Sequence, residues 1–265
     1  MLATISGCDL RQSGRIERET ASAPNDDLQL APDDILLGMD DTLFATGDVQ
    51  PASDNAQSLA TGSTATYVLP SPDIKGSVSV EEALQNRRSR RNFQTKALSQ
   101  EQLSQLLWSA YGITEPGRGL RTTPSAGATY PLEIYVIIGN VTDIETGVYR
   151  YNPLNHEITE VKSGDIRSEL SAAALGQTMV ADAPITIVYT AVFRRIEERY
   201  GERGRERYIF MEIGHSAQNV YLQAEVLGLG TCAIGAFSDD TVRQLLNLPT
   251  DEVPLYLLPV GNIAS

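Results

Sequence analysis

The stretch Arg87-Arg88-Ser89-Arg90-Arg91-Asn92-Phe93 places four arginines within five residues of a protein whose formal net charge is −13. Guanidinium groups bind phosphate and carboxylate in bidentate fashion and stay charged at physiological pH. A short helical pattern over residues 79–86 precedes the cluster, with Ser79 and Glu82 spaced as a capping box. The stretch therefore predicts a site for one small anionic group, such as a phosphate. A solvated basic turn is the alternative.

Two segments of small residues follow further along the chain. Residues 124–131 read PSAGATYP and lead into an apolar run, so that backbone there can approach a flat ligand closely. Residues 233–237 read AIGAF and follow a long helical pattern. Taken singly, the glycines are also explained by tight packing and the prolines by a turn.

The remaining periodicity predicts a mixture of helices and strands. Ser99 and Gln102 form a second capping box, and Gly112 closes that helix. Gly201 and Gly204 are expected to break the helical stretch that begins at residue 193. The elements do not alternate as regular βαβ units, which favours an α+β fold. Helices are expected over residues 99–111, 165–175, 207–227 and 239–246, and strands over 133–138, 147–151, 157–161, 185–191 and 255–260.

The N-terminal part differs in composition from the rest. Residues 1–75 hold 12 Asp and Glu against 4 Lys and Arg, and their apolar residues show no sustained periodicity. Such a segment cannot offset its ordering entropy by burial. Residues 1–76 are therefore expected to be a disordered acidic tail or linker, with a possible docking patch at residues 35–44, and residues 77–265 to be the folded domain.

Several kinds of site and partner are excluded by composition. An acidic chain has no general attraction for nucleic acid. Two cysteines, Cys8 and Cys232, and two histidines, His156 and His215, support neither a disulfide framework nor a metal site. Cys232 lies in apolar company and reads as an inert core thiol, and His215 as a helix-packed, hydrogen-bonded residue rather than a catalytic one.

Nothing in the sequence predicts an integral membrane span, so a cytoplasmic location is the default expectation. Residues 5–8 (ISGC) are similar to a lipobox. The alternative is therefore an envelope lipoprotein anchored at Cys8, if the true start lies upstream.

As an ordered set, the arginine stretch, PSAGATYPLEIYV and GHSAQNVYLQAEVLGLGTCAIGAF resemble the flavin-binding elements of the nitroreductase superfamily. The branch of SagB-type dehydrogenases, which includes azoline oxidases of peptide biosynthesis, is the most similar, over residues 78–261. The resemblance implies an FMN-binding α+β sandwich whose flavin lies at the interface of a homodimer. It assigns the phosphate and ribityl chain to Arg87, Arg88, Ser89 and Arg91, one side of the isoalloxazine ring to Pro124, Ser125, Ala126 and Gly127, and the other side to Ile234 and Gly235.

Two positions depart from the family pattern. Many relatives carry a basic residue just past the terminal strand, where this chain has Gly261 and Asn262. The azoline oxidases carry a Lys-Tyr pair where this chain has Arg199-Tyr200. An arginine cannot act as a base, because it stays charged. Tyr200 is expected to relay a proton and Arg199 to orient an anionic substrate, and a solvated surface pair is the alternative.

The expected function is that of an FMN-dependent oxidoreductase, which either reduces an organic acceptor or dehydrogenates a peptide heterocycle. A non-catalytic flavin-fold scaffold or partner in a biosynthetic complex is the alternative, and a module that binds anionic peptides is a third reading. A homodimer is also expected because residues 220–227 and 255–260 are too apolar for the surface of a monomer of this size.

Overall fold

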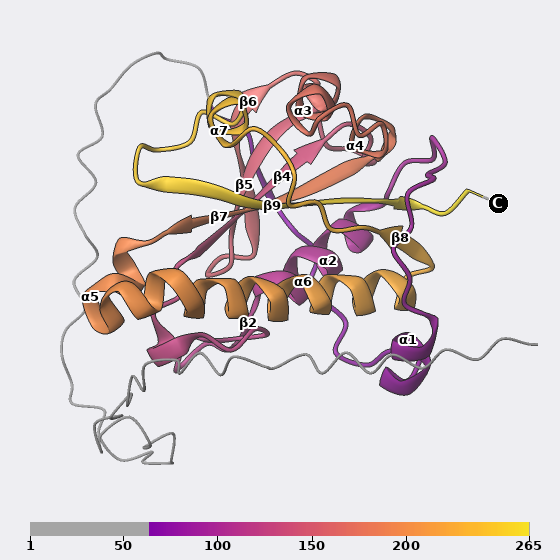
Figure 1. Cartoon of the computed structure of the whole chain (residues 1–265). Helices are drawn as coiled ribbons and strands as arrows, with labels where there is room; N and C mark the ends of the chain where they lie inside the picture. Colours follow the sequence, from indigo (N-terminus) through magenta and orange to yellow (C-terminus); the bar gives the residue numbers. More distant parts are fainter. Residues whose placement is uncertain (1–63, 265) are drawn as a thin grey trace, which may run out of the picture. The chain divides into compact units, whose positions relative to one another are not determined.

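A seven-stranded antiparallel sheet is the framework of the folded part of the chain (Figure 1). The structure is a computed structural model that describes residues 64–264. The strands lie in the order β1-β6-β5-β4-β7-β9-β8. Their bounds are β1 (Thr66–Val68), β4 (Leu132–Ile138), β5 (Gly147–Asn152), β6 (Glu157–Ser163), β7 (Ile185–Val192), β8 (Leu229–Thr231) and β9 (Glu252–Asn262), and a separate pair is formed by β2 (Ile113–Glu115) and β3 (Leu120–Arg121).

Helices cover both faces of this sheet, which confirms the expected α+β sandwich (Figure 1). One layer holds α1, α2 and the long helix α6, and the opposite layer holds α3, α4 and α7. The helices are α1 (Val80–Asn86), α2 (Gln100–Tyr111), α3 (Arg167–Ala173), α4 (Met179–Asp182), α5 (Arg194–Arg203), α6 (Ile209–Val226) and α7 (Asp239–Leu245).

The position of the central strand β4 explains why its sequence is apolar at every residue after Glu133. Successive side chains of a strand point to opposite faces of the sheet. Ile134, Val136 and Ile138 enter the core beneath α2 and α6, whereas Tyr135 and Ile137 enter the core beneath α3 and α7. Because helices cover both faces, both sets of side chains are buried. Its neighbour β7 is buried at every position for the same reason.

The expected helix starts are confirmed in the first helical layer. Ser99 and Gln102 form both hydrogen bonds of a capping box at the start of α2. Ser79 accepts the Glu82 N–H at the start of α1. Gly112 follows α2 as expected, but its φ of −67° is not left-handed. A Cβ there would lie 2.3 Å from Trp108 Cδ1, so close packing is the reason for glycine at this position.

The helical stretch between β7 and β8 changes direction at one glycine, not at two. Gly201 has φ +56° and ψ −147° inside α5, which is the break that its sequence predicts. Gly204 has ordinary helical dihedrals and begins the π-helical turn η3 (Gly204–Tyr208). A Cβ at Gly204 would lie 3.0 Å from side-chain atoms of Ile196 and Tyr200, so this glycine allows α5 and η3 to pack closely.

The folded unit begins earlier than the expected boundary after residue 76. Strand β1 pairs with β6 at the edge of the sheet, and Leu69 is buried in the core. Residues 64–76, which the expected division assigns to the tail, are therefore part of the fold. Residues 1–63, with Cys8 and the patch at residues 35–44, lie outside the described residues.

The apolar character of β9 also has a different cause from the expected one. Leu257, Leu258 and Val260 are fully buried because β9 lies between β7 and β8 within one chain. Val220 and Ala224 of α6 likewise face the core. The side chains of these residues are already buried within one chain, so their apolar character is not evidence for a dimer.

A group of polar side chains ties the turn between β5 and β6 to residues near the start of the fold. His156 Nδ1 lies 2.9 Å from Tyr151 Oη, and His156 Nε2 lies 2.7 Å from Ser104 Oγ and 3.0 Å from the Pro70 carbonyl oxygen. A neutral ring fits these contacts, since Nδ1 accepts from Tyr151 and Nε2–H donates. Burial lowers the pKa of His156, although the bond to Pro70 opposes this shift.

We predict that His156 makes the protein less stable in mild acid. Because the pKa of His156 is lowered by folding, the unfolded chain binds the proton first as pH falls through about 6.5, and stability is lost from there downward. Replacing His156 by Asn suits the φ of +50° at this position and removes the titrating ring. The variant should be about 1–3 kcal/mol less stable at pH 7.5, by the loss of its hydrogen bonds.

Urea unfolding of both proteins at pH 7.5 and 5.5 checks this expectation. The gap in stability between wild type and His156→Asn should narrow at the lower pH. Carboxyl groups that titrate in the same range are common to both proteins and cancel in the comparison. An unchanged gap at the two pH values would contradict the role given to His156.

Candidate functional site

Side chains of helix α6 contact the loop segments of the candidate site at three places along its length. Near its start, Glu212 accepts a hydrogen bond of 2.7 Å from Ser125 Oγ. Near its middle, Asn219 Nδ2 donates to the carbonyl of Thr122. Further along, Tyr221 contacts Ser89. Nine residues separate Glu212 from Tyr221, which is about 14 Å along a helix.

The arginine stretch and the second small-residue segment lie side by side, as the resemblance implies. Ser89 forms a parallel bridge with Thr231, and the Arg90 N–H donates to the Thr231 carbonyl at 2.9 Å. Tyr221 Oη accepts a 2.7 Å hydrogen bond from the Ala233 N–H and lies 3.2 Å from Ser89 Oγ. One tyrosine hydroxyl on α6 therefore joins the two segments.

The arginines of this stretch are not equivalent. None of them forms an ion pair with a residue in the described part of the chain. The guanidinium of Arg87 lies 5.4 Å from the ring centroid of Tyr221, and Arg91 is exposed. Arg88 is held in place, because its Nη1 donates to the carbonyls of Gln85 and Arg87 at the end of α1. Arg90 packs its stem against Gly230, where a Cβ would lie only 2.6 Å away.

The first small-residue segment folds into a tight turn, η2 (Ala126–Ala128), whose shape depends on Ser125 and Gly127. Ser125 Oγ donates to Glu212 and accepts the Tyr130 N–H at 2.9 Å, which closes the turn. Pro124 and Gly127 are exposed, so the outer side of the turn is open to a ligand. Gly127 has φ +58°, a conformation that favours glycine.

Arg199 and Tyr200 contact this same turn, although they are far from it in sequence. Arg199 Nη1 donates to the Gly127 carbonyl at 3.1 Å. A Cβ on Gly127 would lie 2.6 Å from Tyr200 Oη and 2.7 Å from Arg199 Nε. Glycine therefore leaves room for both side chains. The Tyr200 ring also packs edge-on against Tyr208 at 5.1 Å. The pair is thus held against the loop, while the Arg199 side chain is exposed.

Glu212 belongs to the site and was not identified from the sequence. Its side chain is buried, and Tyr111 Oη and Ser125 Oγ both donate to its carboxylate. Burial raises the pKa of Glu212, while the hydrogen bonds from Tyr111 and Ser125 act in the opposite direction. A carboxylate on the same helical face as Ile209 and Ile213 is unusual, and that is the signal that could have revealed it.

Ile234 and Gly235 present different atoms to the exterior. The Ile234 side chain is 4% exposed and packs in the core beneath α7, and its backbone pairs with Leu257. A ligand at this position would therefore meet backbone and not the Ile234 side chain. Gly235 is exposed, and the nearest atom to a Cβ built there is 3.9 Å away.

The remaining candidates of the sequence analysis take no part in this site. His215 is exposed on α6 and forms no hydrogen bond with a described residue, unlike the packed histidine that was expected. Cys232 is buried, and burial raises the pKa of its thiol. Over residues 64–264, no three His, Cys, Asp or Glu side chains gather as metal ligands, and no helix is long and apolar enough to cross a bilayer.

Comparisons with known proteins agree with this geometry. The model of the nitroreductase family matches residues 84–262. A Methanocaldococcus jannaschii protein named "putative nitroreductase" is 47% identical over 190 residues, covering 72% of this chain and 93% of its own length. The microcin B17-processing protein McbC of Escherichia coli is 29% identical, with 63% of each chain covered.

A crystal structure from Ralstonia eutropha, likewise named a putative nitroreductase, superposes with a TM-score of 0.68 at 30% identity. The match covers 82% of this chain and 98% of the other. Members of the matched family are generally FMN-dependent oxidoreductases. By its sequence and by its fold, this chain belongs to the nitroreductase family, and its relatives include a peptide-processing protein.

Proposed function

We propose that this protein is an FMN-dependent oxidoreductase. The observation that carries the proposal is the cationic surface at residues 87–91, held beside Thr231 and Ala233 by the hydroxyl of Tyr221. A cluster of guanidinium groups that forms no ion pair within residues 64–264 fits a phosphate, which accepts several charge-assisted hydrogen bonds. FMN, when bound, would supply the transfer of an electron pair or hydride.

The residues present fit such a cofactor. Arg87, Arg91 and Ser89 would hold its phosphate and ribityl chain. Arg88 would add charge from a fixed position, since its guanidinium is already bonded to backbone carbonyls. Flat backbone segments would flank the ring: Pro124, Ser125, Ala126 and Gly127 on one side, and Gly235 with the backbone of Ile234 on the other.

A homodimer would complete these sites. The two small-residue segments contact opposite parts of α6, and Phe210 and Met211 of the same helix are each 52% exposed. Apolar side chains this exposed on a central helix favour a partner surface. We place a second copy of this chain on α6, so that each flavin is held between two chains.

The Arg199–Tyr200 pair is assigned to the substrate side. Arg199 remains charged and would orient an anionic group of the substrate or stabilise negative charge that develops on it. Tyr200 carries a phenol that can pass a proton, and its Oη lies next to the open side of Gly127. The substrate is an organic acceptor or, in the direction suggested by the similarity to McbC, a heterocycle in a processed peptide.

The first prediction concerns the cofactor. Replacing Arg87 and Arg91 together by Ala should weaken FMN binding about 10²–10⁴-fold, because a charge-assisted hydrogen bond contributes about 1.5–3 kcal/mol. The visible absorbance of the desalted protein measures the retained flavin. Arg118→Ala with Arg194→Ala removes the same charge elsewhere and should keep the flavin. Full flavin in the Arg87/Arg91 variant would overturn the phosphate assignment, and a folded, colourless wild type would favour the non-catalytic scaffold.

The second prediction concerns association. Met211→Glu places a charge on the exposed part of α6 and should convert a dimer into monomers that lose FMN on dilution. Light scattering coupled to gel filtration measures both mass and absorbance. Ile74→Glu, at a residue that is 81% exposed, is the matched control and should remain dimeric. A flavin-loaded wild-type monomer at micromolar concentration would rule out the shared site.

The third prediction concerns proton transfer. Tyr200→Phe removes one hydroxyl and should leave flavin content unchanged, while turnover of a substrate verified with the wild type falls about 10²–10⁴-fold. Tyr208→Phe deletes the hydroxyl of the neighbouring ring and should have little effect. Arg199→Lys keeps the charge and restores the residue found in the azoline oxidases. If Tyr200→Phe turns over the substrate at the wild-type rate, Arg199 and Tyr200 are surface residues without a role in proton transfer.

A further inference from the structure

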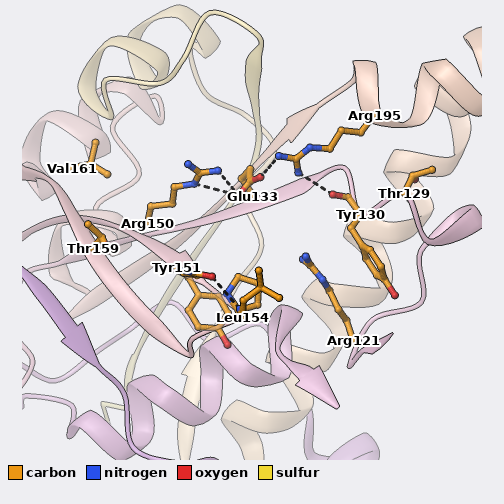
Figure 2. A pocket seen from close by; sticks show the side chains of 12 residues that line it. Arg121, Thr129, Tyr130, Glu133, Arg150, Tyr151, Leu154, Thr159, Val161 and Arg195 are labelled. Atoms are coloured by element: carbon orange, nitrogen blue, oxygen red, sulfur yellow. Dashed lines mark hydrogen bonds and ion pairs between the residues drawn. The ribbon is translucent and has the colours of Figure 1, made fainter. Parts of the chain in front are cut away.

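A cavity of about 700 Å³ opens at one end of the sheet, beside α5 and the turn between β5 and β6 (Figure 2). Its walls include Thr129 and Tyr130, which directly follow the turn that contacts Arg199 and Tyr200. None of the residues assigned to the flavin lines it. The cavity is therefore a separate space that adjoins the substrate side of the proposed active site.

Positive charge dominates this cavity, in contrast to the acidic chain as a whole. Three arginines line it, Arg121, Arg150 and Arg195, against the single carboxylate of Glu133. Arg150 Nη2 lies 3.0 Å from Glu133 Oε2, and Arg195 Nη2 lies 2.6 Å from Glu133 Oε1. The charged side chains that line the cavity therefore sum to plus two. Two buried carboxylates, Glu212 and Glu252, lie near Arg121 and Arg150 respectively without lining the cavity, and burial raises the pKa of each.

Arg121 is the one of the three that forms no ion pair with a residue in the described part of the chain. Its guanidinium lies 4.2 Å from the ring centroid of Tyr111 and 4.4 Å from that of Tyr130, so two aromatic rings fix its position. Its Nε is buried and has no hydrogen-bond partner among residues 64–264. Figure 2 shows the Arg121 side chain running alongside Tyr130, with its nitrogen end directed toward the middle of the lining side chains. A buried donor without an acceptor is costly unless a ligand supplies one.

The other arginines also keep free donors. Arg150 uses two of its nitrogens on Glu133, and Arg195 divides its donors between Glu133 and the Tyr130 carbonyl at 3.0 Å. A guanidinium carries five N–H donors, so each retains some that no described residue accepts. Their side chains are 45% and 39% exposed and thus accessible from the cavity.

Most of the rest of the wall is apolar or aromatic, with Thr129, Asn152 and Thr159 as the uncharged polar residues. Tyr151, Pro153, Leu154 and Val161 line the cavity on the side of the β5–β6 hairpin, and Leu154 is 78% exposed. Pockets of this size with apolar walls and a few fixed polar groups hold organic molecules rather than bare ions. The lining therefore suits a ligand that has both an anionic head and an apolar body.

We propose that this cavity binds a carboxylate-bearing organic molecule, with the carboxylate on Arg121 between Arg150 and Arg195 and the apolar body against Tyr151, Pro153 and Leu154. The carboxylate belongs to a free small acid or to an acidic peptide side chain, and the experiment below distinguishes the two. The assignment of this ligand as the substrate rests on the proposed function. It is motivated by the position of Arg195, which lies one helical turn before Arg199 on α5. The binding site itself does not depend on it.

Titration calorimetry with hippurate tests the proposal, because hippurate joins a carboxylate to an aromatic body. Hippurate should bind the full-length protein, and its uncharged amide should not. Arg121→Gln should weaken hippurate binding about tenfold to hundredfold, as expected for the loss of a charge-assisted contact. Arg118→Gln, on the nearby exposed turn, is the matched control and should bind as the wild type does. If Arg121→Gln fails to fold, Arg150→Gln at a half-exposed position replaces it.

A second arm identifies the source of the carboxylate. The capped dipeptide amides of Asp-Phe and Asn-Phe differ only by the charge of one side chain. Arg121-dependent binding of the Asp peptide points to an acidic peptide, and binding of hippurate alone points to a free acid. The proposal is overturned if neither binds, if Arg121→Gln binds both like the wild type, or if inorganic phosphate alone binds at Arg121.

A separate measurement tests whether hippurate binding depends on the flavin. Hippurate binding should persist in the flavin-depleted variant with Arg87→Ala and Arg91→Ala. Loss of hippurate binding in that variant would assign the ligand to the flavin surface and contradict a separate cavity. A wild type that binds hippurate at Arg121 but holds no flavin would leave this site standing while the proposed oxidoreductase function fails.

Discussion

Ser216 fixes the long helix α6 against the sheet, and each segment of the candidate site depends on the position of that helix. Ser216 Oγ is buried 2.6 Å from the Ala110 carbonyl and 3.0 Å from the hydroxyl of Tyr189. With a single proton, the serine donates to the carbonyl of α2 and accepts from the tyrosine of β7. A displaced helix would leave these buried groups unpaired, which costs about 1–3 kcal/mol for each group. The polar contact therefore specifies one register for α6.

The same helix explains how segments distant in sequence come together. Its apolar face enters the core, and the polar residues at the margins of that face reach out to backbone segments. Glu212 holds the turn at Ser125, and Tyr221 joins Ser89 to Ala233. Loops ordered in this way can place backbone close to a flat ligand without filling the space with side chains. A rigid element with loops attached at fixed points is a common basis for binding sites.

The sequence predicts the regular elements well because their signals are local. The capping box at Ser99 and the apolar run over residues 134–138 of β4 each depend on neighbouring residues alone. Strand β1 was missed because it has only three residues and pairs only with β6, which is distant in sequence. The dimer argument from residues 255–260 failed because a continuous apolar run does not distinguish an internal strand from a contact surface.

The candidate site is less readable from sequence, since it is assembled over long separations. Motif resemblance grouped the arginine stretch with residues 233–237 and singled out Arg199, but it indicated neither the bridge between Ser89 and Thr231 nor the contact of Arg199 with Gly127. The role of Glu212 depends on Tyr111 and Ser125, which lie about one hundred residues away along the chain. The arginines around Glu133 come from β3, β5 and α5, and Glu133 itself lies in β4. No local sequence pattern therefore predicts this group.

Helix α5 is a short segment that carries Arg195 toward one cavity and Arg199 with Tyr200 toward the turn at Gly127. In the described part of the chain it has one fully buried side chain, Ile196, and its helical geometry is broken at Gly201, where φ is positive. Its sequence can therefore diverge with little disturbance of the core. With the roles proposed for Arg195 and Arg199, exchange of this ten-residue segment among family members would change which molecules are bound while the opposite end of α6 stays constant. Such modularity offers an evolutionary route by which one scaffold acquires new substrates.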